Sequence, residues 1–183
     1  MRIEDAEQSS IHFSSLLNPS MTVDITYRID VTPSDRKEIR QVVESTGFFS
    51  EEEIEIAVEL VEERLSKGLQ SGYHFLFGEL TDRIIGYTCF GPIPGAAKRY
   101  DLYWIVVHHD FRRAGIGKSL MVKTEEAIEK QGGERIYIDT SSRDQYRTTR
   151  LFYRSCGYQE EAVLKDFYGP GDDKVIYVKD IRP

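Results

Sequence analysis

The residues best suited to chemistry lie in a glycine-rich turn that runs from Arg112 to Lys118. Gly115 and Gly117 let the backbone approach a ligand closely, and the first turn of a following helix carries N–H groups without partners. Arg112, Arg113 and Lys118 add positive charge. Because free N–H groups and cations at a helix start attract anions, the turn is predicted to hold a phosphate.

The elements around this turn are a buried strand before it and a helix after it. Residues 102–107 form an apolar run rich in aromatic and β-branched residues, which is typical of a strand, and Ile116, Leu120 and Met121 recur at helical spacing. A nucleotide-triphosphate loop would need glycine where this chain has Arg112. A dinucleotide fingerprint would need its third glycine where the chain has Leu120.

A third interpretation rests on a resemblance to a known family. The pattern Arg112-x-x-Gly115-x-Gly117, after a strand that ends in Val107, resembles the acyl-CoA pyrophosphate loop of GCN5-related N-acetyltransferases (GNAT). Residues 151–158, Leu-Phe-Tyr-Arg-Ser-Cys-Gly-Tyr, are similar to the second signature of that family. Its usual asparagine and alanine are replaced here by Tyr146 and Thr149.

The resemblance implies a fold and a cofactor. The fold is α/β (α+β): a mixed sheet of about seven strands, splayed between strands four and five, with four helices. Residues 23–183 would form a single such domain after an N-terminal extension, residues 1–22. Acetyl-CoA would bind in the gap as co-substrate. The implied cofactor-binding residues are Ile105, Val106, Val107, Arg112, Arg113, Ala114, Gly115, Ile116, Gly117, Lys118, Tyr146 and Tyr153.

Two residues are predicted to move protons. Tyr153 matches the family's tyrosine, so it is the expected general acid that protonates the leaving thiolate. Asp101 lies on the strand where some members carry a catalytic glutamate, so it is the expected general base. Period-two alternation predicts that Leu102 and Trp104 face the core and that Asp101 shares the other face with Tyr103 and Ile105.

The predicted function is an acetyl-CoA-dependent N-acetyltransferase that acts on a primary amine of a small molecule. Phe48, Phe49 and Tyr168 are the expected acceptor contacts, and the sequences around them look like one subgroup of the family. Names within that subgroup suggest D-alanine or another amino acid as the acceptor. Three alternatives stay open: a module that senses acyl-CoA without catalysis, a peptide or protein N-acetyltransferase, and a phosphate-binding NTPase domain.

The composition of the chain limits the classes of binding partner that we expect. The chain has 183 residues, a net charge of −7 and two cysteines. The acidic balance argues against nucleic acid and weakly favours a cationic or neutral acceptor. No apolar run is long enough to cross a membrane, so we expect a cytoplasmic protein, with a homodimer as one possible assembly. No cluster of cysteine, histidine or acidic residues has the spacing of a metal site.

Shorter signals predict the remaining elements. Thr32-Pro33-x-Asp35 predicts a helix start with a capping hydroxyl, and Ser50-x-x-Glu53 predicts a capping box. Strands are expected at 23–29, 73–79, 84–90, 135–139, 160–167 and 175–180, with a hairpin turn at 80–83.

Overall fold

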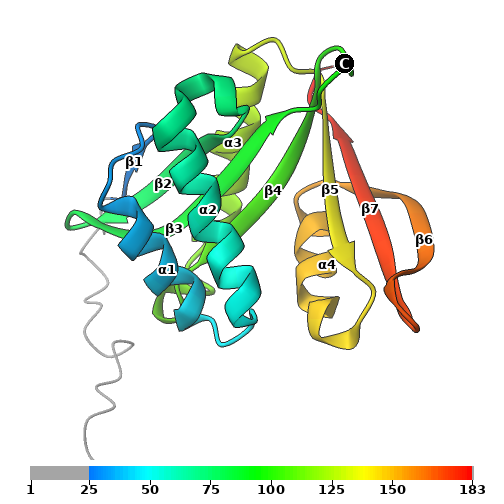
Figure 1. Ribbon diagram of the computed structural model, residues 1–183. Coiled ribbons are helices and arrows are strands. Elements are labelled where there is room, and N and C mark those ends of the chain that lie inside the picture. Colours follow the sequence, from blue (N-terminus) through cyan, green and yellow to red (C-terminus); the bar gives the residue numbers. More distant parts are fainter. Residues whose placement is uncertain (1–24, 183) are drawn as a thin grey trace, which may run out of the picture.

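Seven strands form one mixed sheet within residues 25–182, which are the residues that this computed structural model describes. The strands are β1 (Thr26–Arg28), β2 (His74–Leu80), β3 (Arg83–Pro92), β4 (Arg99–Val107), β5 (Arg135–Ser141), β6 (Gln159–Gly169) and β7 (Asp172–Asp180). Their order in the sheet is β1-β2-β3-β4-β5-β7-β6, and only β4 and β5 run parallel (Figure 1). The predicted seven-stranded mixed sheet is therefore confirmed. The predicted extension, residues 1–22, lies outside the described residues.

Four α-helices cover the sheet, as predicted: α1 (Asp35–Ser45), α2 (Glu51–Lys67), α3 (Ile116–Lys130) and α4 (Arg147–Ser155). Helices α1 and α2 lie on one face of β1–β4 and α3 lies on the other, while α4 lies beside β5 and β7 (Figure 1). The molecule therefore has two halves, which meet between β4 and β5.

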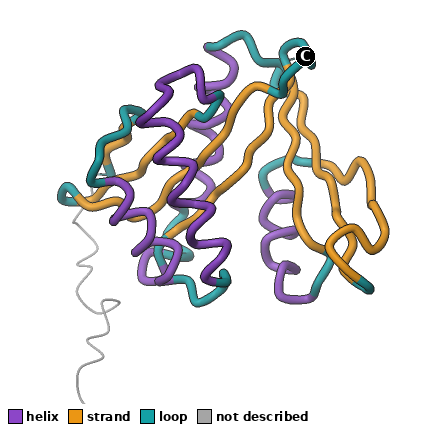
Figure 2. Tube along the Cα trace, viewed as in Figure 1, coloured by secondary structure: helices purple, strands orange, loops and turns teal. Residues whose placement is uncertain are grey.

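The sheet divides along that line. Strands β4 and β5 pair at only three positions, from Arg99 with Arg135 to Asp101 with Tyr137. Beyond Asp101 the two strands diverge, and Figure 2 shows the halves joined at one end and separated at the other. The splay that the family resemblance implied is present at the implied position.

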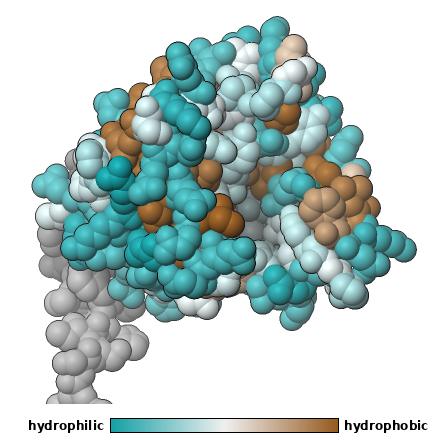
Figure 3. All heavy atoms as spheres, in the orientation of Figure 1, coloured by the Kyte–Doolittle hydropathy of each residue, from teal (hydrophilic) through white to brown (hydrophobic). Residues whose placement is uncertain are grey.

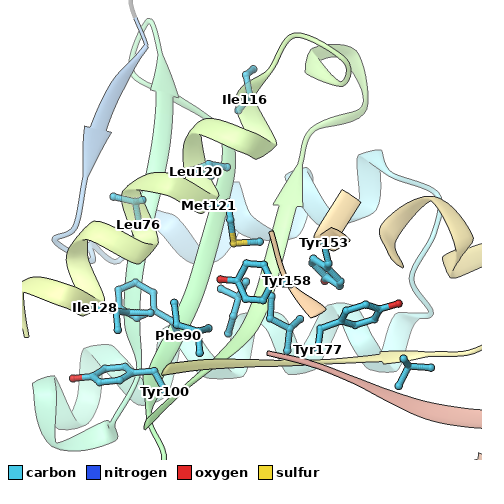
Figure 4. Close-up of a cluster of buried hydrophobic side chains, with 14 of the residues drawn as sticks. Leu76, Phe90, Tyr100, Ile116, Leu120, Met121, Ile128, Tyr153, Tyr158 and Tyr177 are labelled. Atoms are coloured by element: carbon cyan, nitrogen blue, oxygen red, sulfur yellow. The ribbon is translucent and has the colours of Figure 1, made fainter. Parts of the chain in front are cut away.

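Two buried clusters hold the layers together. One lies under α3 and continues through Met121 to Tyr153, Tyr158 and Tyr177 in the second half of the sheet (Figure 4). The other lies between the sheet and helices α1 and α2, and includes Val61 and residues of β2 and β3. The first cluster contributes most to fixing the relative position of the two halves, because its side chains come from both.

Local signals set most of the element ends. Ser50 and Glu53 form the predicted capping box at the start of α2. The hairpin between β2 and β3 turns at Thr81 and Asp82, both with positive φ. The predicted capping hydroxyl of α1 is wrong: the N-cap, Ser34, makes no side-chain capping hydrogen bond, and the hydroxyl and N–H of Thr32, before the helix, both donate to the Asp35 carboxylate.

A β-bulge in β4 overturns the predicted alternation. Cys89 pairs with Trp104, but the next residue of β3 pairs with Leu102, so Tyr103 is an extra residue. Leu102 and Ile105 consequently pack in the cluster under α3, whereas Trp104 packs against the cluster under α1 and α2. The prediction that Leu102 and Trp104 share a face was wrong because period-two alternation assumes an uninterrupted strand.

An ion pair anchors the start of α1 to the sheet. Asp35 is only 1% exposed, and its carboxylate accepts hydrogen bonds from Arg28 at 2.9 and 3.0 Å and from the Thr32 backbone at 2.8 Å. Arg28 also donates to Glu79 and lies over the ring of Phe77. The pKa of the Arg28 guanidinium is raised, since hydrogen bonds to these two carboxylates outweigh its burial. These contacts join β1, β2 and α1.

We expect Asp35→Ala to destabilise the protein because it leaves Arg28 and the Thr32 N–H without their main acceptor. The loss should be about 2–3 kcal/mol, below the ~3–5 kcal/mol of a fully buried pair since Arg28 keeps some contact with water. Urea unfolding measures it. Glu62→Ala is the control: it breaks an ion pair with Arg36 whose side chains are about half exposed, and it should cost less than about 1 kcal/mol. Equal losses would contradict this account.

Candidate active site

A cavity of about 820 Å³ lies where β4 and β5 separate, and the space-filling view is hollowed between the two halves (Figure 3). Its walls come from β4, β5, the turn before α3, the link between α1 and α2, and α4. Of the residues predicted for cofactor or acceptor, those that line it are Phe48, Phe49, Ile105, Val106, Val107, Arg112, Arg113, Gly117, Tyr146, Tyr153 and Tyr168.

The phosphate-type turn has the backbone that a phosphate site needs. Arg113 and Gly115 both have positive φ, and Gly115 is the N-cap of α3. The N–H groups of Ile116, Gly117 and Lys118 fall in the first turn of the helix, where no intrahelical acceptor exists. They and the helix dipole favour an anion here.

The cations of the turn are available to a ligand. Arg112, Arg113 and Lys118 are exposed, and within residues 25–182 none of them forms an ion pair. Ala114, Gly115, Ile116 and Lys118 do not line the cavity. Ile116 is instead 4% exposed and packs in the core under α3, so only its backbone could meet a ligand.

Gly117 lies between the two halves of the molecule. A Cβ atom added there would lie 3.5 Å from the Phe152 ring and 3.7 Å from Val107 Cγ2. These are ordinary contact distances, so a small side chain fits without breaking the fold. A larger one would extend along Val107 and Phe152, which both line the cavity.

The free edge of β4 faces the separation. Ile105 and Val107 pair with Thr88 and Gly86 of β3, but beyond Asp101 β4 has no partner on its other side. Backbone groups in the middle of a sheet need hydrogen-bond partners. An extended ligand with amide groups could supply them as an added strand does.

Tyr153 brings its phenol to this cavity from α4. The side chain is 6% exposed, and its ring lies 5.8 Å from the Tyr177 ring and 6.5 Å from the Tyr158 ring. Burial raises the pKa of Tyr153 well above its ordinary value. Its hydroxyl therefore stays protonated at neutral pH and can act as a proton donor.

Aromatic side chains form the opposite wall. Phe48 meets Tyr146 edge to face at 4.7 Å across the cavity, so the α1–α2 link touches the start of α4. Phe49 lies 5.1 Å from the ring of Trp104, the only tryptophan of the chain. Because Tyr168 also lines the cavity, the three predicted acceptor residues are gathered around one space.

The predicted base lies in an adjoining space. Asp101 is half-buried at the last paired position of β4 and β5, and it lines a second cavity of about 310 Å³. Burial is the main reason that its pKa is raised; the negative charge of Asp139 raises it further and Lys174 opposes the shift. Lys174 forms an ion pair with Asp139. Tyr153 does not line this second cavity, so the structure separates the two predicted catalytic residues.

Several cavity residues were not predicted. Trp104 was assigned to the core, although the bulge turns it toward the cavity. Asp139, Thr140 and Ser141 line the cavity from β5, and Arg143 follows them. Their position after the point where β5 leaves β4 could have identified them. No group of three potential metal ligands occurs among residues 25–182.

Comparison with known proteins identifies the family that this chain resembles. The model of the acetyltransferase (GNAT) family matches residues 38–158. A crystal structure from Desulfovibrio desulfuricans, named as a GNAT-family acetyltransferase, is 42% identical, with a TM-score of 0.86 over 87% of this chain and 100% of that one. No curated protein matches significantly.

Two more distant structures show the same fold. An aminoglycoside 6'-N-acetyltransferase from Enterococcus faecium has a TM-score of 0.70 at 21% identity, over 87% of this chain and 98% of that one. An N-acetyltransferase from Thermoplasma acidophilum in complex with coenzyme A has a TM-score of 0.65 at 20% identity, over 86% and 99%.

Proposed function

The chain belongs to the GNAT family of acetyltransferases, and from that premise we propose that it moves the acetyl group of acetyl-CoA to a primary amine of a small molecule. One observation carries the proposal: an anion-binding turn, a free strand edge and a buried phenol all line one cavity. An amino acid such as D-alanine is one acceptor to test.

Each part of the cavity would serve one step. The first-turn N–H groups of α3, with Arg112 and Arg113, would bind the pyrophosphate. The free edge of β4 near Ile105 and Val107 would bind the pantetheine amides. When bound, acetyl-CoA supplies an activated acyl group as a thioester.

Proton transfer completes the proposal. The acceptor arrives as an ammonium and must lose a proton before its nitrogen can attack, and Asp101 would accept that proton, directly or through water. Tyr153 would donate its phenolic proton to the leaving thiolate. The phenol is protonated at neutral pH, since its pKa lies above that of an ordinary tyrosine, so it has a proton to give.

Two alternatives remain distinguishable. A sensing module would bind acyl-CoA without consuming it in the presence of any amine. A protein acetyltransferase would need a long open groove for a peptide, and the ribosomal-protein-S18-alanine N-acetyltransferase from Escherichia coli, at 15% identity, shares the fold alone. The contact between the rings of Phe48 and Tyr146 across the cavity favours a small acceptor.

The proposal also includes a homodimer and a cytoplasmic location. Strand β6 is an edge strand that exposes Val163, Leu164 and Phe167, and exposed apolar groups of this kind support a contact with a second copy. No helix among residues 25–182 is long and apolar enough to cross a membrane.

Gly117→Val should weaken CoA binding at least about tenfold, or roughly 1.4 kcal/mol. Its side chain would extend into the space beside Val107 and Phe152 where the pyrophosphate is proposed to lie. Calorimetry with CoA measures the affinity, and a circular dichroism spectrum establishes that the variant is folded. Gly117→Ala should lose less because its Cβ makes only ordinary contacts. Unchanged binding in folded Gly117→Val would reject the loop assignment.

Tyr153→Phe should lower turnover by roughly 10² or more, as for loss of a general acid, while CoA affinity changes little. The variant keeps the ring and its contacts with Tyr158 and Tyr177. Tyr158→Phe is the matched control, since Tyr158 is equally buried but does not line the cavity. Steady-state rates should be taken where chemistry limits turnover. Equal activity of the two variants would remove Tyr153 from the mechanism.

The acidic limb of the pH–rate profile should report Asp101, since a base works only when deprotonated. Asp101→Asn should lower kcat and abolish or displace that limb. Asp139→Asn should move the limb to lower pH, because it removes a neighbouring negative charge that raises the pKa of Asp101 and frees Lys174 to lower it. Profiles of kcat/KM for the three proteins provide the comparison. Identical profiles would show that neither carboxylate is involved.

A further inference from the structure

The smaller cavity is an extension of the larger one. Tyr103, Trp104 and Asp139 line both, so they mark the junction between the two spaces. The larger cavity contains the proposed CoA site and Tyr153, whereas Asp101 lines only the smaller one. A molecule whose body fills the smaller cavity would therefore present a protruding group at the junction, toward the acetyl end.

Aromatic side chains dominate the walls of this extension. Tyr73, Tyr103, Trp104 and Tyr137 all line it, and the rings of Tyr73 and Tyr103 meet edge to face at 5.4 Å. Its volume of about 310 Å³ exceeds the roughly 150 Å³ of an apolar cavity that admits benzene. Flat aromatic walls and this volume suit a ring or a bulky apolar group.

The charges at the extension favour a cation. The Asp101 carboxylate has no ion pair or side-chain hydrogen bond with any residue in 25–182, and the residue is half-buried. Lys174 pairs with Asp139 and also acts on Asp101, so one lysine faces two carboxylates and the local charge stays negative. Arg143, which lines the main cavity, pairs with Asp172 at 3.0 Å.

Aromatic rings add to the same preference. The face of an aromatic ring attracts a cation electrostatically, so Tyr103 and Trp104 at the junction reinforce the carboxylates. A free carboxylate on the acceptor would meet the opposite situation, because it would approach two carboxylates, Asp101 and Asp139, whose combined charge Lys174 balances only by half. Like charges in so confined a space repel each other.

We propose that the acceptor is a primary amine carried on an aromatic or bulky apolar body that bears no carboxylate, with the body in the extension and the ammonium at the junction. This inference rests on the proposed acetyl transfer and names its substrate class. It predicts that amino acids with a free carboxylate are poorer acceptors, with a lower kcat/KM, than the corresponding amino alcohols.

Paired substrates test the charge requirement. Phenylalaninol and phenylalanine share one body and differ in a hydroxymethyl group against a carboxylate, and both enantiomers of each should be used. With acetyl-CoA and the full chain, kcat/KM for phenylalaninol should exceed that for phenylalanine by at least about tenfold. Phenethylamine should exceed butylamine, which lacks the ring, and putrescine, which replaces the ring with a second cation.

A variant at the rim tests the location. Ile56 lines the extension from α2 and is 42% exposed, so its replacement leaves the buried side of the helix intact. Ile56→Arg adds a cation beside the cavity and should shift the phenylalanine-to-phenylalaninol ratio of kcat/KM about tenfold toward phenylalanine. Ile56→Gln, of similar length without charge, should leave the ratio unchanged. An equal shift in both variants would contradict a charge effect.

Binding separates this inference from the proposed function. Trp104 is the only tryptophan and lies in the shared wall, so its emission reports an amine titrated into the CoA-bound protein. If the protein binds phenylalaninol better than phenylalanine but acetylates no amine, the inference holds and the proposed enzymatic function is rejected. Turnover or binding that prefers phenylalanine, putrescine or butylamine would overturn the inference and keep the cavity as an acceptor site. If the protein shows no binding preference and no turnover, both the inference and the proposed function are overturned.

Discussion

The site depends on how few positions hold β4 and β5 together. Parallel pairing ends at Asp101 and Tyr137, yet each strand continues for several residues and is paired on its other side, β4 with β3 and β5 with β7. The sheet therefore contains two inner edges that are held apart by packing rather than by hydrogen bonds. Backbone groups on such edges retain unused hydrogen-bonding capacity. A ligand with amide groups can use it at little cost, because the edges are already fixed.

Packing has to keep those edges apart, and the cluster under α3 does so. Met121 of α3, Tyr153 of α4 and Tyr177 of β7 belong to one buried cluster, although they come from opposite sides of the separation. Tyr153 is thus a structural residue and a cavity residue at once. Burial raises the pKa of its phenol further above neutral, and the cluster that buries it joins the second half of the molecule to the first.

The sequence was informative where local chemistry decides the structure. Ser50 and Glu53 cap α2 as predicted, and the order of strands and helices followed from periodicity together with the family resemblance. The sequence-based prediction was wrong at the bulge in β4. The extra residue there is set by how β4 pairs with β3 around Cys89 and Trp104, and the sequence of one strand alone does not reveal it. The cap of α1 failed for a similar reason. Arg28 lies outside the helix and pairs with the Asp35 carboxylate, and the Thr32 hydroxyl donates to that carboxylate rather than capping the helix.

The candidate site was predictable in its cofactor half and much less so in its acceptor half. A phosphate turn is one continuous stretch, so spacing reveals it, whereas the acceptor walls bring Phe49, Trp104 and Asp139 together from three distant segments. Only the fold shows that Asp139 and Asp101 lie on adjacent strands at the place where pairing ends.

The arrangement of charge gives the cavity a direction. Among the described residues, unpaired cations lie in the turn before α3, whereas Asp101 lies where β4 and β5 meet, and the other lining arginine, Arg143, is paired with Asp172. An anionic cofactor and a cationic acceptor would each be attracted to a different end, so neither competes for the place of the other. The same separation has a chemical cost: a carboxylate that attracts an ammonium also stabilises its protonated, unreactive form. Burial and Asp139 reduce that cost, because a carboxylate with a raised pKa accepts the proton more readily. In the proposed reaction, attraction of the amine and its activation would therefore both depend on the environment of Asp101.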